Sequence, residues 1–144
     1  MFVVDTNILV YGANRYSPRH EACRKLLLEW RGRPEPWYLT WGIIYEFLRV
    51  STHPNVLSKP FSFDAAWGFL EAVLVTPTVG VLTETERHGE LVKEVASAVP
   101  GISGNLVFDA HTAILMREHG IKRIYTHDGD FRRFPFLEVI DPLE

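Results

Sequence analysis

The chain has 144 residues, of which 47% are hydrophobic, 23% charged and 12% aromatic. This balance is typical of a globular domain, and it excludes collagen-like, low-complexity and disordered chains. The length predicts one domain covering residues 1–144, and the formal net charge of −3 by itself argues against a nucleic-acid binder held by a broad basic surface.

Short apolar runs alternate with longer amphipathic segments along the sequence. In chain order, the pattern predicts a strand at 2–4, helices at 7–13 and 19–30, a strand at 37–39, helices at 41–50 and 63–75, a strand at 79–82, helices at 83–99 and 105–119, and strands at 121–125 and 137–140. Strands that alternate with helices of this length indicate an α/β fold around a mainly parallel sheet.

Polar residues mark several of the predicted helix ends. Ser62 is the expected N-cap of helix 63–75. Thr83 with Glu86 forms a capping-box pattern at the start of helix 83–99, and Gly120 is placed to end helix 105–119 in a left-handed conformation.

Membrane insertion and disulfide bonding are not expected. Cys23 is the only cysteine, which excludes an internal disulfide bond and a CxxC metal site. The chain starts with an apolar run that is interrupted by Asp5 and has no basic leader. It also lacks the roughly 18 to 20 consecutive apolar residues that a membrane helix needs. We therefore expect a cytoplasmic protein.

Acidic residues follow the first strand and the strand near residue 125. Asp5 lies immediately after the first strand, and Asp128 and Asp130 follow the strand that ends near Thr126. Ligands of open α/β sheets bind at the carboxyl ends of the strands, so neighbouring strands would bring these acids to one edge. Alternatively, Asp5 is only a helix N-cap, and Asp128 and Asp130 with Gly129 form only a turn.

Glu46 and Asp109 lie at the border of the apolar faces of their predicted helices. A carboxylate in that position is costly unless it is paired or binds a metal, although each alone is also compatible with a partly solvated helix residue. Together with the acids at the strand ends, they favour a hard divalent cation held by oxygen atoms, Mg²⁺ or Mn²⁺.

The chain resembles a PIN domain, and within that family the ribonuclease toxins of the VapC kind, from residue 2 to residue 143. The resemblance rests on Asp5-Thr6-Asn7, Glu46-Phe47-Leu48-Arg49-Val50 with Thr52-His53-Pro54, Asn105-Leu106-Val107 with Asp109-Ala110-His111, Glu118-His119-Gly120, Asp128-Gly129-Asp130-Phe131-Arg132-Arg133-Phe134-Pro135 and Asp141-Pro142-Leu143. Phe136 departs from the pattern, because the subfamily usually has glycine there; we expect an altered turn and unchanged chemistry.

The resemblance implies a single PIN domain with a three-layer α/β/α fold and the activity of a Mg²⁺-dependent endoribonuclease, with Mn²⁺ as a possible substitute. Such toxins usually form homodimers and are inhibited by a cognate antitoxin that occupies the cleft. The implied catalytic residues and metal ligands are Asp5, Glu46, Asp109 and Asp128. The implied supporting residues, which orient carboxylates, water or phosphate, are Thr6, Asn7, Thr126 and Asp130, the last also being a candidate ligand of a second metal.

Two other readings of the same residues remain. One is a phosphohydrolase with Asp5 as a covalent nucleophile, although such enzymes generally carry a second Asp where this chain has Asn7. The other is a non-catalytic RNA- or protein-binding module. A catalytic histidine is not expected, because His111 and His127 should point away from the neighbouring acids.

The distribution of charge changes the meaning of the net charge. Leaving out Asp5, Glu46, Asp109, Asp128 and Asp130 leaves 15 basic and 13 acidic residues, a balance of +2. Basic residues are frequent between residues 15 and 33 and recur at 132–133; they form either phosphate-contacting patches or solvated helix faces. The total of −3 therefore does not exclude RNA and predicts that RNA binding requires the metal.

Overall fold

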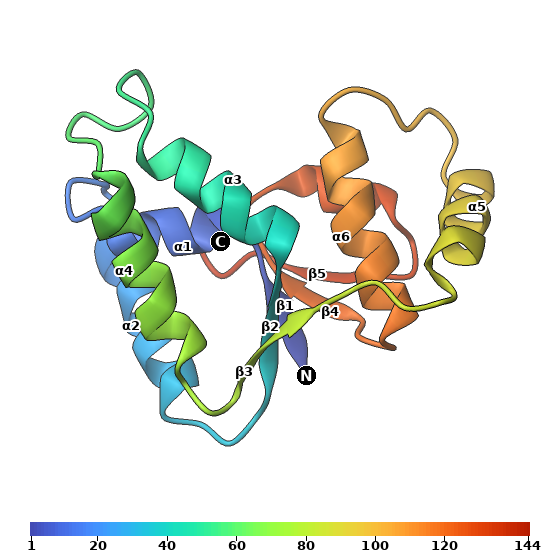
Figure 1. Ribbon diagram of the computed structural model, residues 1–144, viewed down its shortest axis with the longest axis horizontal. Helices are drawn as coiled ribbons and strands as arrows, with labels where there is room; N and C mark the ends of the chain where they lie inside the picture. The colour runs from blue at the N-terminus through green and yellow to red at the C-terminus, as the bar shows by residue number, and fades with distance from the viewer.

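The computed structural model describes residues Met1 to Glu144, and a parallel sheet forms its centre (Figure 1). The sheet has five strands in the order β3-β2-β1-β4-β5, and every neighbouring pair is parallel. The strands are β1 (Phe2–Val4), β2 (Trp37–Thr40), β3 (Val79–Leu82), β4 (Arg123–Tyr125) and β5 (Glu138–Ile140). The predicted α/β class and parallel sheet are confirmed.

Helices cover both sides of the sheet. They are α1 (Thr6–Ala13), α2 (His20–Arg31), α3 (Trp41–Ser51), α4 (Phe63–Leu74), α5 (His88–Ala98), α6 (Leu106–Glu118) and the short 3₁₀ helix η1 (Gly129–Arg133). In Figure 1, α1, α2 and α4 lie to the left of the strands, and α5 and α6 lie to the right. None of these helices is long and apolar enough to span a membrane.

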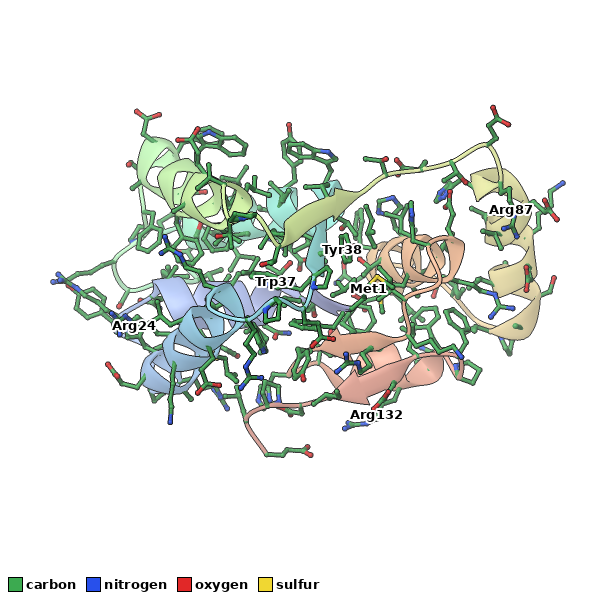
Figure 2. All side chains as sticks on the ribbon, turned by 90° about the horizontal axis from the view of Figure 1, so that it is seen from below. Met1, Arg24, Trp37, Tyr38, Arg87 and Arg132 are labelled. Atoms are coloured by element: carbon green, nitrogen blue, oxygen red, sulfur yellow. The ribbon has the colours of Figure 1, made fainter.

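The apolar faces of these elements meet in one cluster of 31 buried residues. All of β1 is buried, which explains why its sequence is a continuous apolar run without polar alternation. Trp37 is fully buried in the core, whereas Arg24, Arg87 and Arg132 extend from the periphery (Figure 2). This core holds the strand ends and helices that carry the predicted acids.

One predicted helix start was wrong. The helix expected from residue 83 begins at His88, and residues 83–87 form a connecting segment in which Thr83 does not cap a helix. The C-terminal end of α6 binds this segment instead: Nε2 of His119 lies 2.7 Å from the carbonyl oxygen of Thr83, and the backbone N–H of Thr85 donates to Glu118. These tertiary contacts replace the capping box that the local sequence indicates.

The other signals at helix ends agree with the structure. The Ser62 side chain accepts a hydrogen bond from the backbone N–H of Ala65 and caps α4. Gly120 has φ +70° directly after α6, a conformation that residues with a Cβ rarely adopt.

The strand order places the end of β1 beside the end of β4. Val4 pairs with Tyr125, and the backbone N–H of Asp5 donates to the carbonyl oxygen of Tyr125 at 3.0 Å. The chain from β1 continues through α1 to β2 on one side, whereas β4 lies on the other side of β1. This is a topological switch point, where open α/β sheets form a crevice at the carboxyl ends of their strands.

Candidate functional site

A pocket of about 290 Å³ lies at this switch point. Its lining includes carboxylates from separate parts of the chain: Asp5 after β1, Glu46 on α3, Asp109 in the first turn of α6 and Asp128 after β4. Thr6 and Asn7 line the same pocket. The structure therefore brings together the acids that the sequence suggested for metal binding and catalysis.

Asp5 is almost completely buried and is held by donors on both carboxylate oxygens. The backbone N–H of Thr6 donates to Oδ1 at 2.8 Å. The Thr126 hydroxyl donates to Oδ2 at 2.8 Å, and the Asn7 amide Nδ2 donates to the same oxygen at 3.2 Å. Asp5 is thus the N-terminal cap of α1, as its alternative interpretation stated, and it also faces the acidic pocket.

Thr126 connects Asp5 to the other strand end. While its hydroxyl donates to Asp5, its oxygen accepts hydrogen bonds from Asn7 Nδ2 at 3.1 Å and from the backbone N–H of Asp128 at 2.9 Å. The backbone N–H of His127 donates to Asn7 Oδ1 at 3.1 Å, which fixes the orientation of that amide. The turn after β4 is therefore tied to the first turn of α1.

Asp130 lies beside Asp128 at the more exposed end of the site. The backbone N–H of Asp130 donates to Asp128 Oδ1 at 2.9 Å, so the two residues do form a turn. Carboxylate oxygens of Asp109, Asp128 and Asp130 also lie within 4.8 Å of one another. The turn and the acidic cluster are therefore the same feature.

Glu46 reaches the pocket from an exposed position on α3. The Thr6 hydroxyl lies 3.4 Å from Glu46 Oε2 and 3.3 Å from the carbonyl oxygen of Ile43. Thr6 therefore connects the first turn of α1 with α3 and orients Glu46 toward Asp5. Its role as a supporting residue stays a prediction.

The electrostatics of the pocket favour positive charge. Burial raises the pKa of the Asp5 carboxyl to about 6, although the hydrogen bonds from Thr126 and Thr6 act in the opposite direction. Burial and the negative charges of Asp128 and Asp5 raise the pKa of Asp109 to about 7. These carboxylates lie close together without a basic side chain between them, and a cation would remove their mutual repulsion.

The donor set fits a hard divalent cation. All the converging side chains offer oxygen atoms, and neither a thiol nor an imidazole lines the pocket. Oxygen-only sites with several carboxylates are typical of Mg²⁺ and Mn²⁺. Asp109, Asp128 and Asp130 have carboxylate oxygens close enough to share one ion, and Asp5 borders the same cavity.

Both histidines next to the acids in sequence point elsewhere. His111 lies 2.8 Å from Glu84, through Nε2, and His127 lies 2.8 Å from Asp141, through Nδ1. Neither lines the acidic pocket.

Sequence reasoning missed the polar rim of the pocket. Tyr11, Asn14 and Ser17 line it beside the acids. Asn7, Tyr11 and Asn14 recur at the spacing of one helical face, and that signal was available in the sequence. The guanidinium of Arg19 lies 5.3 Å from the centroid of the Tyr11 ring, which brings a positive charge to the rim.

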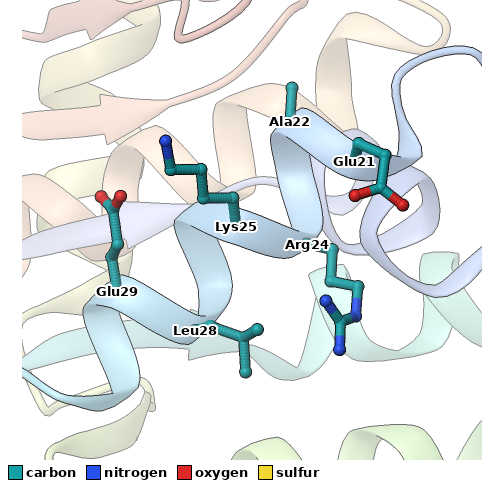
Figure 3. Close-up of a pocket in the computed structure, with 6 residues that line it drawn as sticks. All are labelled: Glu21, Ala22, Arg24, Lys25, Leu28 and Glu29. Atoms are coloured by element: carbon teal, nitrogen blue, oxygen red, sulfur yellow. The ribbon is translucent and has the colours of Figure 1, made fainter.

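A larger open hollow of about 680 Å³ lies elsewhere, along the outer side of α2 (Figure 3). Its lining comes from this single helix and mixes acidic side chains, such as Glu21 and Glu29, with basic ones, such as Arg24 and Lys25. No set of like groups converges there. The smaller acidic pocket is therefore the candidate active site.

Comparisons with known proteins agree with this geometry. The sequence matches the PIN domain family over residues 2–137. It is 36% identical over 138 residues to ribonuclease VapC48 of Mycobacterium tuberculosis, covering 96% of this chain and 94% of the relative. It is 33% identical over 144 residues to ribonuclease VapC43 of the same species, covering 100% and 97%.

Solved structures show the same fold. The crystal structure of Mycobacterium tuberculosis VapC20, described as a toxin that cleaves the sarcin-ricin loop, matches with a TM-score of 0.65 at 23% identity, covering 92% of this chain and 93% of that one. VapBC2 from Rickettsia felis, solved bound to a DNA fragment from its promoter, matches with a TM-score of 0.66 at 17% identity, covering 96% of each chain.

Proposed function

Because the chain belongs to the PIN-domain family and to the VapC ribonucleases within it, we propose that it is a Mg²⁺-dependent endoribonuclease and the toxin of a toxin–antitoxin pair. The observation that carries this proposal is the convergence of Asp5, Glu46, Asp109 and Asp128 on one pocket. The match over residues 2–137 supports a single PIN domain comprising residues 1–144.

In this proposal, Asp5, Glu46, Asp109 and Asp128 hold the cation, directly or through water. When bound, Mg²⁺ supplies Lewis-acid polarisation of the scissile phosphate and of the attacking water. Mn²⁺ has the same preference for oxygen ligands and is the expected substitute.

The contributions of the chain's own residues follow from their hydrogen bonds. Thr126 donates its only hydroxyl proton to Asp5 Oδ2, which keeps that oxygen an unprotonated acceptor. Asp5 Oδ1 accepts only the backbone N–H of Thr6 and therefore keeps a lone pair for a cation. Asn7 and the backbone of Thr6 complete the positioning of Asp5. The backbone N–H of Asp130 orients Asp128, and Asp130 itself is exposed enough to contact solvent or a further cation.

The proposed substrate is RNA, and the proposed protein partners are a cognate antitoxin and a second copy of this chain. The rim residues Tyr11 and Asn14 and the nearby Arg19 offer a stacking surface, an amide and a positive charge to a sugar-phosphate backbone. Relatives of this fold include a VapBC pair, which supports an antitoxin partner.

The phosphohydrolase alternative has less support from the geometry. Asn7, where a second Asp would be needed, donates to Asp5 and cannot act as an acid. A phosphorylated Asp5, trapped with a phosphate-ester substrate, would favour this alternative, and we expect none.

The direct test is RNA cleavage by the purified protein and its Asp5→Asn variant. With Mg²⁺ we expect the unmodified protein to cut RNA, EDTA to stop the reaction, and Asp5→Asn to lower the rate about 100-fold or more. Asp64→Asn, which removes an exposed carboxylate on α4, is the matched control and should cleave normally. Circular dichroism checks that both variants are folded.

Undiminished cleavage by folded Asp5→Asn would refute the assignment of the pocket, and full activity in EDTA would refute metal dependence. Calorimetric Mg²⁺ titration distinguishes the non-catalytic module: such a module should bind Mg²⁺ no better than an Asp5→Asn/Asp109→Asn double variant. Sequencing of RNA 5′ ends after induction in cells then identifies the target RNA.

A further inference from the structure

A second group of metal-ligating side chains lies outside the acidic pocket, between α5, α6 and the segment 83–87. One ligand atom from each of Glu84, His88 and His111 lies within 4.8 Å of the other two. Glu84 belongs to the connecting segment, His88 is the first residue of α5, and His111 lies on α6. Figure 1 shows α5 and α6 side by side, with this segment entering α5.

The rings of His88 and His111 are held in defined orientations. Their centroids are 6.0 Å apart and their planes are inclined by 77°. Nδ1 of His111 faces Gly42 of α3, where a Cβ would come within 3.1 Å of it. Nε2 of the same ring lies 2.8 Å from Glu84 Oε1, so a ring nitrogen and a carboxylate oxygen already face each other.

The Glu118 carboxylate contacts one ring nitrogen of His88 and holds the ring in place. Nδ1 of His88 lies 2.6 Å from Glu118 Oε1, and the Glu118 side chain is only 1% exposed. This contact leaves Nε2 as the His88 nitrogen without a protein partner. A histidine that binds a metal through one ring nitrogen usually donates its other ring N–H to a carboxylate. That hydrogen bond fixes the tautomer and orientation of the ring and makes it a better ligand.

We propose that Glu84, His88 and His111 form a binding site for Zn²⁺, with solvent as the fourth ligand. Imidazole and carboxylate ligands suit Zn²⁺, whereas the acidic pocket, with oxygen donors alone, suits Mg²⁺. The negative charges of Glu84 and Glu118 balance the double charge of the ion. This site does not depend on the proposed nuclease function.

The ligands need only a small movement to reach zinc geometry. At Zn–N and Zn–O distances of about 2.0–2.1 Å, tetrahedral ligands lie roughly 3.3 Å apart. The contact between Glu84 and His111 is 2.8 Å, and the third ligand lies within 4.8 Å. Glu84 is exposed on a segment without regular structure, so its side chain can adjust. A bound ion would join this segment and the start of α5 to α6.

The experiment uses the full chain, stripped of metal with a chelator and then held in excess Mg²⁺ to occupy the acidic pocket. We expect calorimetry with Zn²⁺ to show one ion bound per chain. Zn²⁺ at about 100 times its dissociation constant should raise Tm by roughly 5 °C or more. Co²⁺ in place of Zn²⁺ should give a visible absorption spectrum typical of nitrogen ligation.

Variants separate this site from the acidic pocket. His88→Gln/His111→Gln should abolish the Zn²⁺ binding, and Glu118→Gln should weaken it about 10- to 100-fold through the orientation of His88. Asp5→Asn should leave it unchanged, as should His53→Gln, which removes a histidine elsewhere. Glu84→Gln, an exposed substitution that cannot unfold the core, should weaken Zn²⁺ binding at least as much as Glu118→Gln.

The proposal is wrong if the stripped chain binds no Zn²⁺ under these conditions. It is equally wrong if binding survives both Glu84→Gln and the double histidine substitution, or if it disappears in Asp5→Asn, since the ion would then occupy the acidic pocket. Loss of RNA cleavage in Asp5→Asn with retained Zn²⁺ binding would support the two sites separately.

Discussion

Replacing Asp109 with asparagine should stabilise the metal-free protein while removing its proposed activity. Burial and nearby negative charge raise the pKa of Asp109 from 3.8 to about 7, which means that the fold disfavours its ionised form. The causes of this pKa shift are burial and the neighbouring carboxylates, and they include no hydrogen bond to Asp109. The asparagine side chain therefore removes a repelled negative charge and breaks no hydrogen bond that stabilised it. Sites of this kind exchange stability for function.

The size of the effect follows from the pKa. A pKa shift from 3.8 to about 7 means that ionised Asp109 destabilises the folded state by about 4 kcal/mol if the group is fully buried and unscreened. Asp109 is only partly buried, and solvent screens its charge, so we expect about 1 to 2 kcal/mol. For a domain of this size that is a rise in Tm of roughly 2 to 8 °C.

The sign depends on pH in a defined way. Because the folded pKa is raised above the unfolded value, the folded state binds more protons between pH 3.8 and about 7, and the stability of the unmodified chain falls as pH rises through this window. The advantage of Asp109→Asn should therefore be full near pH 8 and absent near pH 4. With saturating Mg²⁺ the order should reverse, since only the unmodified site gains binding energy.

Urea unfolding measures the free energy of unfolding of the unmodified chain and of Asp109→Asn. The measurements are made in EDTA at pH 8 and pH 4, and again at pH 8 with Mg²⁺. Asp64→Asn serves as the control for loss of an exposed carboxylate and should change stability by less than about 0.5 kcal/mol. A variant that is less stable than the unmodified chain in EDTA at pH 8 would refute the reasoning. So would an advantage of the same size at both pH values.

Three further predictions concern the supports of the site and the fold. Thr126→Val removes the hydroxyl between Asp5 and Asp128 and should lower Mg²⁺ affinity, measured by calorimetry, about 10- to 100-fold in a folded protein; unchanged affinity would show that this hydroxyl is dispensable. Gly120→Ala meets no atom within 4 Å of its new Cβ, so the positive φ alone should cost about 1 to 2 kcal/mol in urea unfolding, and a neutral result would contradict this. Leu115→Ala in the buried core should cost about 2 to 5 kcal/mol in the same assay, whereas a cost below 1 kcal/mol would mean that the core closes around the gap.

The sequence was sufficient to predict the elements that carry the acidic pocket. Alternation of apolar runs and amphipathic segments identified each strand and each α-helix, although not the short 3₁₀ helix η1, because burial of one face imposes those periods. The rule that parallel strands present their carboxyl ends at one edge then grouped Asp5 with Asp128. The strand order that makes β1 and β4 neighbours comes from long-range packing, and no local pattern encodes it.

Residues 83–87 show where local signals fail. The Thr83 and Glu86 pattern is a good helix start in isolation, but Glu118 and His119 supply stronger partners from more than thirty positions away. The prediction of a helix at 83–99 also gave no indication that Glu84, His88 and His111 lie together. Had the helix begun at 83, Glu84 and His88 would have occupied successive turns of one helix, with nothing to indicate that α6 faces them.

The neighbouring positions of β1 and β4 have a consequence for synthesis of the protein. Asp5 is translated more than a hundred residues before Asp109 and Asp128. Until β4 pairs with β1, Thr126 cannot hold Asp5, and no partly synthesised chain has the complete acidic pocket. Pairing of parallel strands that are far apart in the sequence is slow, because the entropic cost of closing the loop comes before the stabilising contacts form. Under the proposed nuclease function, a growing chain cannot cut RNA until β4 has been synthesised and has paired with β1, and an antitoxin has this interval in which to bind.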